Sequence, residues 1–162
     1  MSVVRDPASK IMNRDRAVAW RRAQPATARV VFTNGVFDLL HPGHVDVLAG
    51  ARGQGDALVV GVNSDESVRR LKGPGRPVRD AVERCYLLAA LEAVDAVVVF
   101  DEDTPLELIL ALKPDVLVKG GDYAEASIVG AREVTQWGGR VAVVPLTPGH
   151  STTSTIQRLR GH

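Results

Sequence analysis

The sequence has one cysteine, no long apolar run and no excess of charge of either sign. The single thiol, Cys85, excludes an intrachain disulfide, and its apolar helical setting indicates a buried structural role. No run of 18 apolar residues could span a membrane, and no apolar stretch near the start precedes a small-residue cleavage site. We therefore expect a cytoplasmic protein without a transmembrane helix or a signal peptide.

The net charge of +1 provides no broad electrostatic field that would attract nucleic acid or an anionic membrane. With 45% hydrophobic and 24% charged residues, the 162-residue chain has the composition of one globular domain. The first 30 residues hold seven Lys or Arg residues and two acidic ones. This local excess indicates a solvated terminal helix, and an arm that attracts phosphate is the alternative.

After residue 28, short valine-rich runs alternate with helical patterns, which predicts an open, doubly wound α/β fold with helices on both faces of a parallel sheet. The predicted strands are Arg29–Thr33, Asp56–Val62, Ala96–Phe100, Val116–Lys119 and Arg140–Pro145. The predicted helices are Gly43–Arg52, Ser64–Leu71, Asp80–Glu92, Pro105–Leu112, Ala126–Trp137 and one after Thr153. Residues 1–28 form a basic helical segment before a single domain of residues 29–162. Such sheets bind ligands beyond the carboxyl ends of their strands.

The strongest indication of function is the segment Phe32–His44, which follows the first predicted strand. His41 and His44 would face the same side of a first helical turn. Pro42 suits that turn because the N–H it lacks would have no partner there, and Gly43 lets a ligand approach the backbone. Free N–H groups at the positive end of a helix favour a phosphate, whose oxygens the two imidazoles can bind.

Donors fixed at this position would favour catalysis as well as binding. Attack on an α-phosphorus raises the charge on the surrounding oxygens and on the departing pyrophosphate, and fixed donors lower that barrier. A phosphate ester that attacks is already mostly ionised at neutral pH, since its second pKa is about 6, so no strong general base is needed. One alternative is that the two histidines bind zinc, although the familiar helical pair is spaced i, i+4 and no third ligand is evident. The other alternative is that both histidines have only a structural role at the start of the helix.

The residues from Gly35 to His44 match the GxFDxxHxGH signature and so resemble the HxGH-type nucleotidyltransferases. This resemblance implies a Rossmann-like α/β domain in which both histidines contact the nucleotide phosphates. We therefore expect His41 and His44 to be catalytic. Asp38 would orient the histidine loop or form an Asx turn. The loop residues expected to bind the nucleotide are Thr33, Asn34, Gly35, Phe37, Asp38 and Gly43.

Cationic side chains in the loop after the second predicted helix, and on the third, extend the expected site. Lys72 begins a glycine- and proline-rich loop inside the domain, where it would bind the β- and γ-phosphates as a mobile charge; an exposed surface lysine is the alternative. The resemblance favours the catalytic role. Arg84 resembles the family's phosphate-contacting helical arginine, and Arg76 and Arg79 are weaker candidates.

Two further loops complete the predicted site. Lys119 and Gly120 follow a buried strand, and Asp122 would accept hydrogen bonds from a sugar or base; a plain turn is the alternative. The other loop carries the hydroxyls of Ser151, Thr152 and Thr153. They would cap the last helix, contact the nucleotide, or do both.

Over about residues 30–160 the chain also resembles the heptose 1-phosphate adenylyltransferases, including the nucleotidyltransferase half of bifunctional heptose kinase–adenylyltransferases. The matching stretches are Phe32–Gly35, Val62–Asp65, Arg70–Pro74, Leu91–Asp95, Asp101–Pro105, Leu117–Tyr123 and Ser151–Thr153. The resemblance implies transfer of AMP from ATP to a heptose 1-phosphate, with Mg²⁺ accompanying the triphosphate. We predict no metal site made of protein side chains. It also implies a separate sugar kinase upstream and is compatible with a homodimer.

Two alternatives remain open at this point. Related glycerol-3-phosphate cytidylyltransferases carry an arginine in an RTEGIST-type segment where this chain has Leu146, and the loss of the guanidinium weakens that interpretation. The second alternative is a nucleotide-binding module without turnover. Intact His41, His44 and Lys72 argue against it, because a protein that only binds would be free to lose them.

Overall fold

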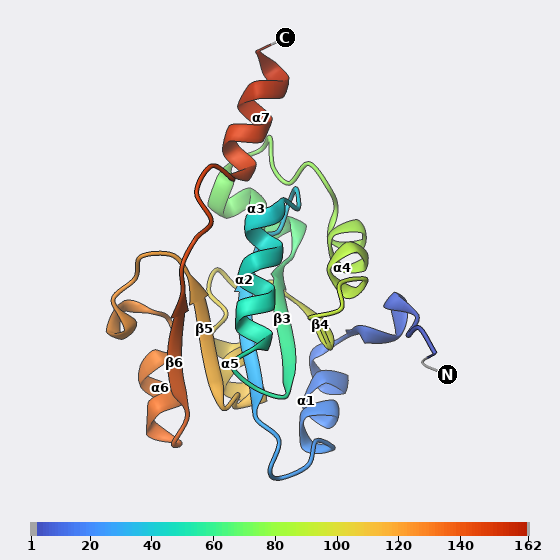
Figure 1. Ribbon diagram of the computed structural model, residues 1–162. Coiled ribbons are helices and arrows are strands. Elements are labelled where there is room, and N and C mark those ends of the chain that lie inside the picture. The colour runs from blue at the N-terminus through green and yellow to red at the C-terminus, as the bar shows by residue number, and fades with distance from the viewer. Residues whose placement is uncertain (1–2, 162) are drawn as a thin grey trace.

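The valine-rich runs form a parallel sheet in the computed structural model, which describes residues 3–161 (Figure 1). In this part of the chain the sheet has six strands in the order β1-β4-β3-β2-β5-β6, and every neighbouring pair is parallel. The strands are β1 (Ile11–Met12), β2 (Val30–Gly35), β3 (Ala57–Asn63), β4 (Ala96–Phe100), β5 (Val116–Gly120) and β6 (Arg140–Val144). The predicted fold class is confirmed, and β1 is a strand that the sequence analysis missed.

The helices follow the predicted alternation, with one correction. The α-helices are α1 (Arg14–Arg22), α2 (Pro42–Arg52), α3 (Asp65–Lys72), α4 (Ala81–Ala89), α5 (Leu106–Leu112), α6 (Ala131–Gln136) and α7 (Thr152–Arg160). Short 3-10 helices are η1 (Pro7–Lys10) and η2 (Glu125–Ser127). The single helix predicted from Ala126 to Trp137 is wrong, because Gly130 adopts a left-handed φ of 88° and separates η2 from α6.

Alternate residues of the strands point to opposite faces of the sheet, and each face is covered by its own helices. Phe32 and Leu117 join a core with α1, α5 and α6, whereas the neighbouring Val31 and Val118 join a core with α2 and α4. Because both faces are covered, the sequences of the strands are nearly continuous apolar runs. In Figure 1, α2 and α4 lie in front of the sheet and α7 projects beyond its upper end. No described helix is long and apolar enough to cross a membrane.

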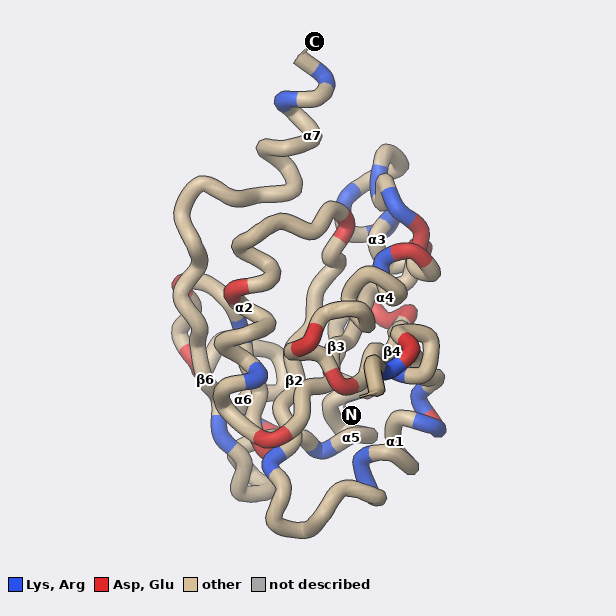
Figure 2. The backbone as a smooth tube through the Cα atoms, turned by 45° about the vertical axis from the view of Figure 1, so that its right-hand side comes forward, with Lys and Arg blue, Asp and Glu red and all other residues tan. Residues whose placement is uncertain are grey.

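The basic N-terminal segment is fastened to the rest of the domain by ion pairs. Arg14 contacts Glu102 at 2.6 Å, and Arg21 contacts Asp115 at 2.9 Å. The same Asp115 carboxylate accepts the backbone N–H of Val30 at 2.8 Å, which ties α1 to the start of β2. Figure 2 shows both signs of charge around α1. The expected solvated helix therefore fits Arg16 and Arg22, which are exposed, but not Arg14 and Arg21, which pair with acidic residues of the domain.

Apolar side chains of α1 also reach the core, and this packing gives a stability prediction. Trp20 is partly buried against the core formed by α1, α5 and α6. We expect Trp20→Ala to lower the free energy of unfolding by about 2–3 kcal/mol, since removal of a large aromatic side chain leaves a cavity. The measurement is urea denaturation, with the exposed Arg22→Ala as a matched control that should change stability by less than about 0.5 kcal/mol. Equal midpoints for both variants would mean that α1 does not belong to the cooperative unit.

Candidate active site

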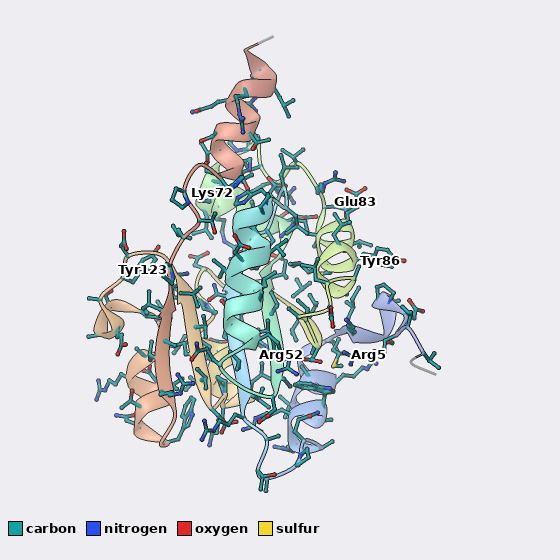
Figure 3. The ribbon with its side chains drawn as sticks, in the orientation of Figure 1. Arg5, Arg52, Lys72, Glu83, Tyr86 and Tyr123 are labelled. Carbon is teal, nitrogen blue, oxygen red and sulfur yellow. The ribbon has the colours of Figure 1, made fainter. Side chains whose placement is uncertain are left out.

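The candidate site lies where the strand order reverses, between β2 and β5, as expected for an open α/β sheet. Two adjoining cavities, of about 430 Å³ and 290 Å³, open at the carboxyl ends of these strands. Asn34 and Gly35 from β2, and Lys119 from β5, line both cavities. In Figure 3, Lys72 and Tyr123 lie toward this end of the sheet, whereas Arg5 and Arg52 lie toward the other end.

The two motif histidines stack on each other at the start of α2. The rings of His41 and His44 are 3.8 Å apart between centroids and 20° from parallel, so the prediction that they face the same side is confirmed. The edge of Phe37 packs on His44 with centroids 5.4 Å apart. Both histidines line the smaller cavity. Two imidazoles therefore lie at the N-terminus of a helix, as predicted, and beside a cavity.

Burial keeps both imidazoles neutral at neutral pH. Burial, and then repulsion from the neighbouring His41, lowers the pKa of His44 to about 4. Burial, and then repulsion from His150, lowers the pKa of His41. The backbone N–H of His41 donates to Nδ1 of His44 at 3.3 Å. Because Nδ1 accepts, the proton of the neutral His44 ring resides on Nε2, which becomes its hydrogen-bond donor.

Gly43 makes room for the histidines themselves. A Cβ atom on Gly43 would lie 3.0 Å from Nδ1 and Cε1 of His41 and 3.3 Å from Cβ of His150. The sequence analysis assigned this glycine to the approach of a ligand. The structure gives a further reason, because any side chain at this position would displace the ring of His41.

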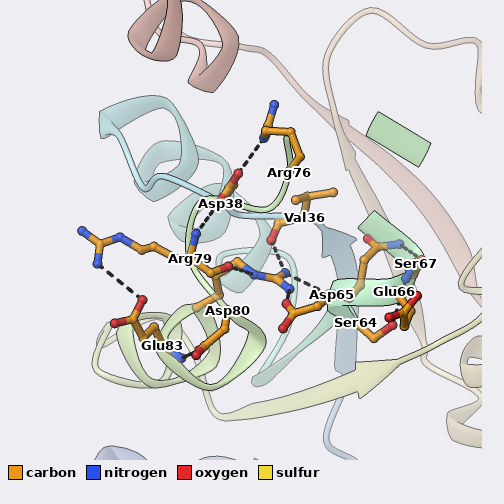
Figure 4. A network of polar contacts seen from close by, with 12 residues as sticks. Val36, Asp38, Ser64, Asp65, Glu66, Ser67, Arg76, Arg79, Asp80 and Glu83 are labelled. Atoms are coloured by element: carbon orange, nitrogen blue, oxygen red, sulfur yellow. Dashed lines mark hydrogen bonds and ion pairs between the residues drawn. The ribbon is translucent and has the colours of Figure 1, made fainter. Parts of the chain in front are cut away.

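The buried carboxylate of Asp38 fastens the histidine loop to the loop that follows α3. It accepts Nε of Arg76 at 2.6 Å and the backbone N–H groups of Val78 and Arg79 at 2.9 Å (Figure 4). Burial raises the pKa of Asp38, but the donors from Arg79, Val78 and Arg76 outweigh it and leave the pKa below its ordinary value. Asp38 lines neither cavity. The expected orienting role fits this geometry, whereas a direct nucleotide contact does not.

Arg84 lies beneath the same loop and is 1% exposed. Its Nη1 donates to the carbonyl oxygens of Val36 and Asn63 at 2.8 Å, its Nη2 to Asp65 at 2.7 Å, and its Nε to the Arg79 carbonyl at 3.0 Å. The expectation that Arg84 contacts a phosphate is corrected by this geometry, because the guanidinium is covered and engaged with protein acceptors. It braces β2, β3 and α4 against one another.

Lysines and backbone groups make up the rest of the predicted site. Lys72 is the last residue of α3 and lines the larger cavity. Burial lowers the pKa of Lys119, whose Nζ lies 5.6 Å from the centroid of the Tyr123 ring. Thr33 donates to the carbonyl oxygen of Val118 at 2.9 Å, so its hydroxyl also links β2 to β5. Gly120 lines the smaller cavity.

Besides Asp38 and Arg84, four more predicted residues do not line the cavities. Asp122 is exposed and outside both linings. The Ser151 hydroxyl accepts the backbone N–H of Ser154 at 3.0 Å, so it caps α7 as one of the two expected roles required. Thr152 donates to the carbonyl oxygen of Leu39 at 3.2 Å, and Thr153 is exposed. A nucleotide contact from these residues stays a prediction.

The sequence analysis missed two side chains that line the smaller cavity. Tyr123 was named only as part of a loop, and His150 was given no role, yet both line this cavity with the motif histidines. The position of His150 just before a hydroxyl-rich helix start was the available indication. Residues 3–161 contain no group of three His, Cys, Asp or Glu side chains that could hold a metal ion, so the zinc alternative lacks its third ligand there.

Residues 32–158 match the protein family described as Cytidylyltransferase-like. The chain is 55% identical over 158 residues to the Bifunctional protein HldE of Acidiphilium cryptum (strain JF-5), which covers 98% of this chain and 31% of that protein. It is 63% identical over 131 residues to the Bifunctional protein HldE of Mesorhizobium japonicum, covering 81% of this chain and 26% of that protein. The chain thus spans about a third or less of the length of these curated relatives.

A solved structure agrees with these matches. The lipopolysaccharide core biosynthesis protein from Thermoplasma volcanium GSS1 is 29% identical, with a TM-score of 0.60 over 74% of this chain and 97% of that one. The family resemblance drawn from Gly35 to His44 is therefore confirmed.

The low pKa of His44 predicts how stability depends on pH. An unfolded histidine takes up a proton below pH 6.5, whereas folded His44 stays neutral until about pH 4, so the folded state loses stability as the pH falls between these values. His44→Asn keeps an acceptor for the His41 N–H and removes this titration. We expect the variant to lose less stability across this window, by on the order of 1 kcal/mol because solvent screens the half-buried ring.

The measurement compares the free energy of unfolding at pH 7 and pH 4.5 for both proteins. Every other titrating group is shared, so the difference of the two pH differences reports the titration of His44 together with its coupling to His41. Parallel pH profiles would show that the His44 ring is protonated as easily in the folded protein as in the unfolded chain.

Proposed function

The chain belongs to the cytidylyltransferase-like family, and from this premise we propose that it is a nucleotidyltransferase that transfers AMP from ATP to a heptose 1-phosphate. The products are an ADP-heptose and pyrophosphate. The observation that carries the proposal is the stacked pair of neutral histidines at the start of α2, beside a cavity at the switch point of the sheet. The resemblance of residues 30–160 to the heptose 1-phosphate adenylyltransferases, together with the similarity to the HldE relatives and to a lipopolysaccharide core biosynthesis protein, supports the sugar phosphate as acceptor.

The reaction requires donors more than it requires a base. A phosphate oxygen of the acceptor attacks the α-phosphorus, a new P–O bond forms, and the bond to the bridging oxygen of the pyrophosphate breaks with its electron pair. The attacking oxygen is already mostly ionised, so no proton has to be removed. Neutral His44, with its proton on Nε2, and His41 donate to the oxygens on which charge develops.

Two adjoining cavities suit a reaction with two substrates. The smaller one contains His41 and His44, and it takes the reacting phosphate of the nucleotide. The larger one contains Lys72, together with Asn34 and Lys119 that it shares with the smaller, and it offers cations to the phosphate groups that meet at the boundary. Lys72 is exposed at the end of α3, so its flexible side chain can follow the phosphates during transfer.

The residues present fit a magnesium ion that arrives with the triphosphate. Among residues 3–161, Asp103 is the single carboxylate that lines either cavity, and it pairs with Nε of Arg70 at 2.9 Å. Magnesium is commonly held by one or two carboxylates together with substrate phosphates, rather than by a cage of protein ligands. The ion supplies charge neutralisation on the phosphate oxygens, and the protein contributes the lysines and imidazoles around them.

A second candidate function is a cytidylyltransferase acting on glycerol 3-phosphate or a similar small phosphate ester. The description of the matched family as Cytidylyltransferase-like favours it. Leu146, which lines the smaller cavity, weighs against it because leucine cannot replace a guanidinium there. The same histidines would carry out both reactions, so the choice of substrate decides between them.

Substrate choice is tested by pyrophosphate release in the presence of Mg²⁺. ATP and CTP are each combined with heptose 1-phosphate and with glycerol 3-phosphate. We expect release with ATP plus heptose 1-phosphate alone. Release with CTP plus glycerol 3-phosphate would keep the histidine chemistry and overturn the proposed substrates. No release with any pair would contradict the proposed pair of substrates.

The role of the histidine pair is tested by His41→Ala and His44→Ala. Each variant loses a donor to the transition state, so kcat should fall on the order of 10²-fold or more while the melting temperature changes little. Val45→Ala, an exposed residue of the same helical turn, is the matched control and should keep full activity. Wild-type rates in both histidine variants would remove the central claim.

A further inference from the structure

His150 lies between β6 and α7, on the wall of the cavity that contains the two motif histidines. Its ring is 5.9 Å from the ring of His41 between centroids and 19° from parallel. His41 in turn stacks on His44 at 3.8 Å. Three imidazoles from two distant segments of the chain therefore form one row along this cavity.

Hydrogen bonds on both sides hold the His150 segment against the histidine loop and α2. Before it, the Thr147 hydroxyl donates to Asp46 of α2 at 2.5 Å. After it, the Thr152 hydroxyl donates to the carbonyl oxygen of Leu39 at 3.2 Å. The backbone of Gly43 passes so close that a Cβ there would lie 3.3 Å from Cβ of His150. The backbone segment that carries the third ring is thus held against the histidine loop and α2.

The row of imidazoles faces no carboxylate within this cavity. The other ionisable side chains that line it, within the part of the chain that the structure describes, are Lys119 and Tyr123. Nδ1 of His41 is buried and has no hydrogen-bond partner among residues 3–161. Three imidazoles and a lysine without an acidic partner match an anion with several oxygens.

We propose that His150 is a third phosphate-binding residue of this site, which contacts the β- and γ-phosphates of the nucleotide, the part that leaves as pyrophosphate. This inference rests on the proposed function. His41 and His44 are half-buried at the inner end of the row, whereas His150 is exposed at the outer end. The reacting α-phosphate belongs at the inner pair, so the leaving group extends toward solvent past His150. There an imidazole N–H donates to an oxygen whose charge rises as the bond to the α-phosphorus breaks.

Binding of inorganic pyrophosphate, followed by calorimetry at pH 7, tests this role without requiring turnover. We expect His150→Ala to weaken binding on the order of tenfold, as the loss of one hydrogen bond to a charged group would. His150→Gln keeps an N–H donor and should recover part of the affinity. Gln157→Ala, exposed on α7, is the matched control and should bind as the wild type does.

The conservative variant separates a contact from an effect on structure. His41, His44, Lys119 and Tyr123 line the same cavity, and all of them remain in both His150 variants. Recovery of affinity in His150→Gln therefore indicates that His150→Ala lost a hydrogen-bond donor. Equal affinities for the wild type and His150→Ala would overturn the proposal.

Kinetics distinguish failure of this inference from failure of the proposed function. With the substrates of the proposed reaction, His150→Ala should raise KM for ATP and leave KM for the sugar phosphate unchanged. A variant that matches the wild type in KM and in pyrophosphate binding, beside an inactive His41→Ala, would overturn the role of His150 alone. A wild type that binds pyrophosphate through His150 but turns over no substrate pair would overturn the proposed function alone.

Discussion

The arrangement of the site depends on two buried charged side chains, Asp38 within the histidine loop and Arg84 beside it. Asp38 holds the loop after α3 through Arg76 and two backbone N–H groups, and Arg84 binds the carbonyl oxygens of Val36 and Asn63. Between these anchors, Phe37 adopts a left-handed φ of 49°, a costly conformation for a bulky residue. The anchors stabilise that turn, and its ring then packs against His44. Without this support, the motif would provide the right residues without their geometry.

The sequence predicted the elements more successfully than it predicted the contacts between them. Periodicity and valine-rich runs located β2 to β6 because both faces of the sheet are buried. The sequence analysis missed β1, because its two residues, Ile11 and Met12, give no periodicity and pair with β4 only in the folded chain. The break at Gly130 was missed because an isolated glycine inside a helical pattern is often tolerated.

The same division applies to the site. His41 and His44 could be predicted because their spacing in the chain is also their spacing on the first turn of α2. Arg84 and His150 could not, because their partners lie far away in the sequence. A lone arginine on a helix carries the same local pattern whether it binds a ligand, pairs with a surface acid or braces a loop. Only tertiary contacts separate these roles.

Charge is divided between two kinds of side chain at this site. Burial, and then repulsion between neighbouring imidazoles, lowers the pKa of the inner two, so they are neutral donors rather than cations. Positive charge must then come from elsewhere, and Lys72 and Lys119 line the adjoining space. Lys72 is exposed at the end of α3, whereas Lys119 is half-buried near the end of β5. A site built this way can fix the transferring phosphate rigidly and still let the charged parts of its substrates enter and leave.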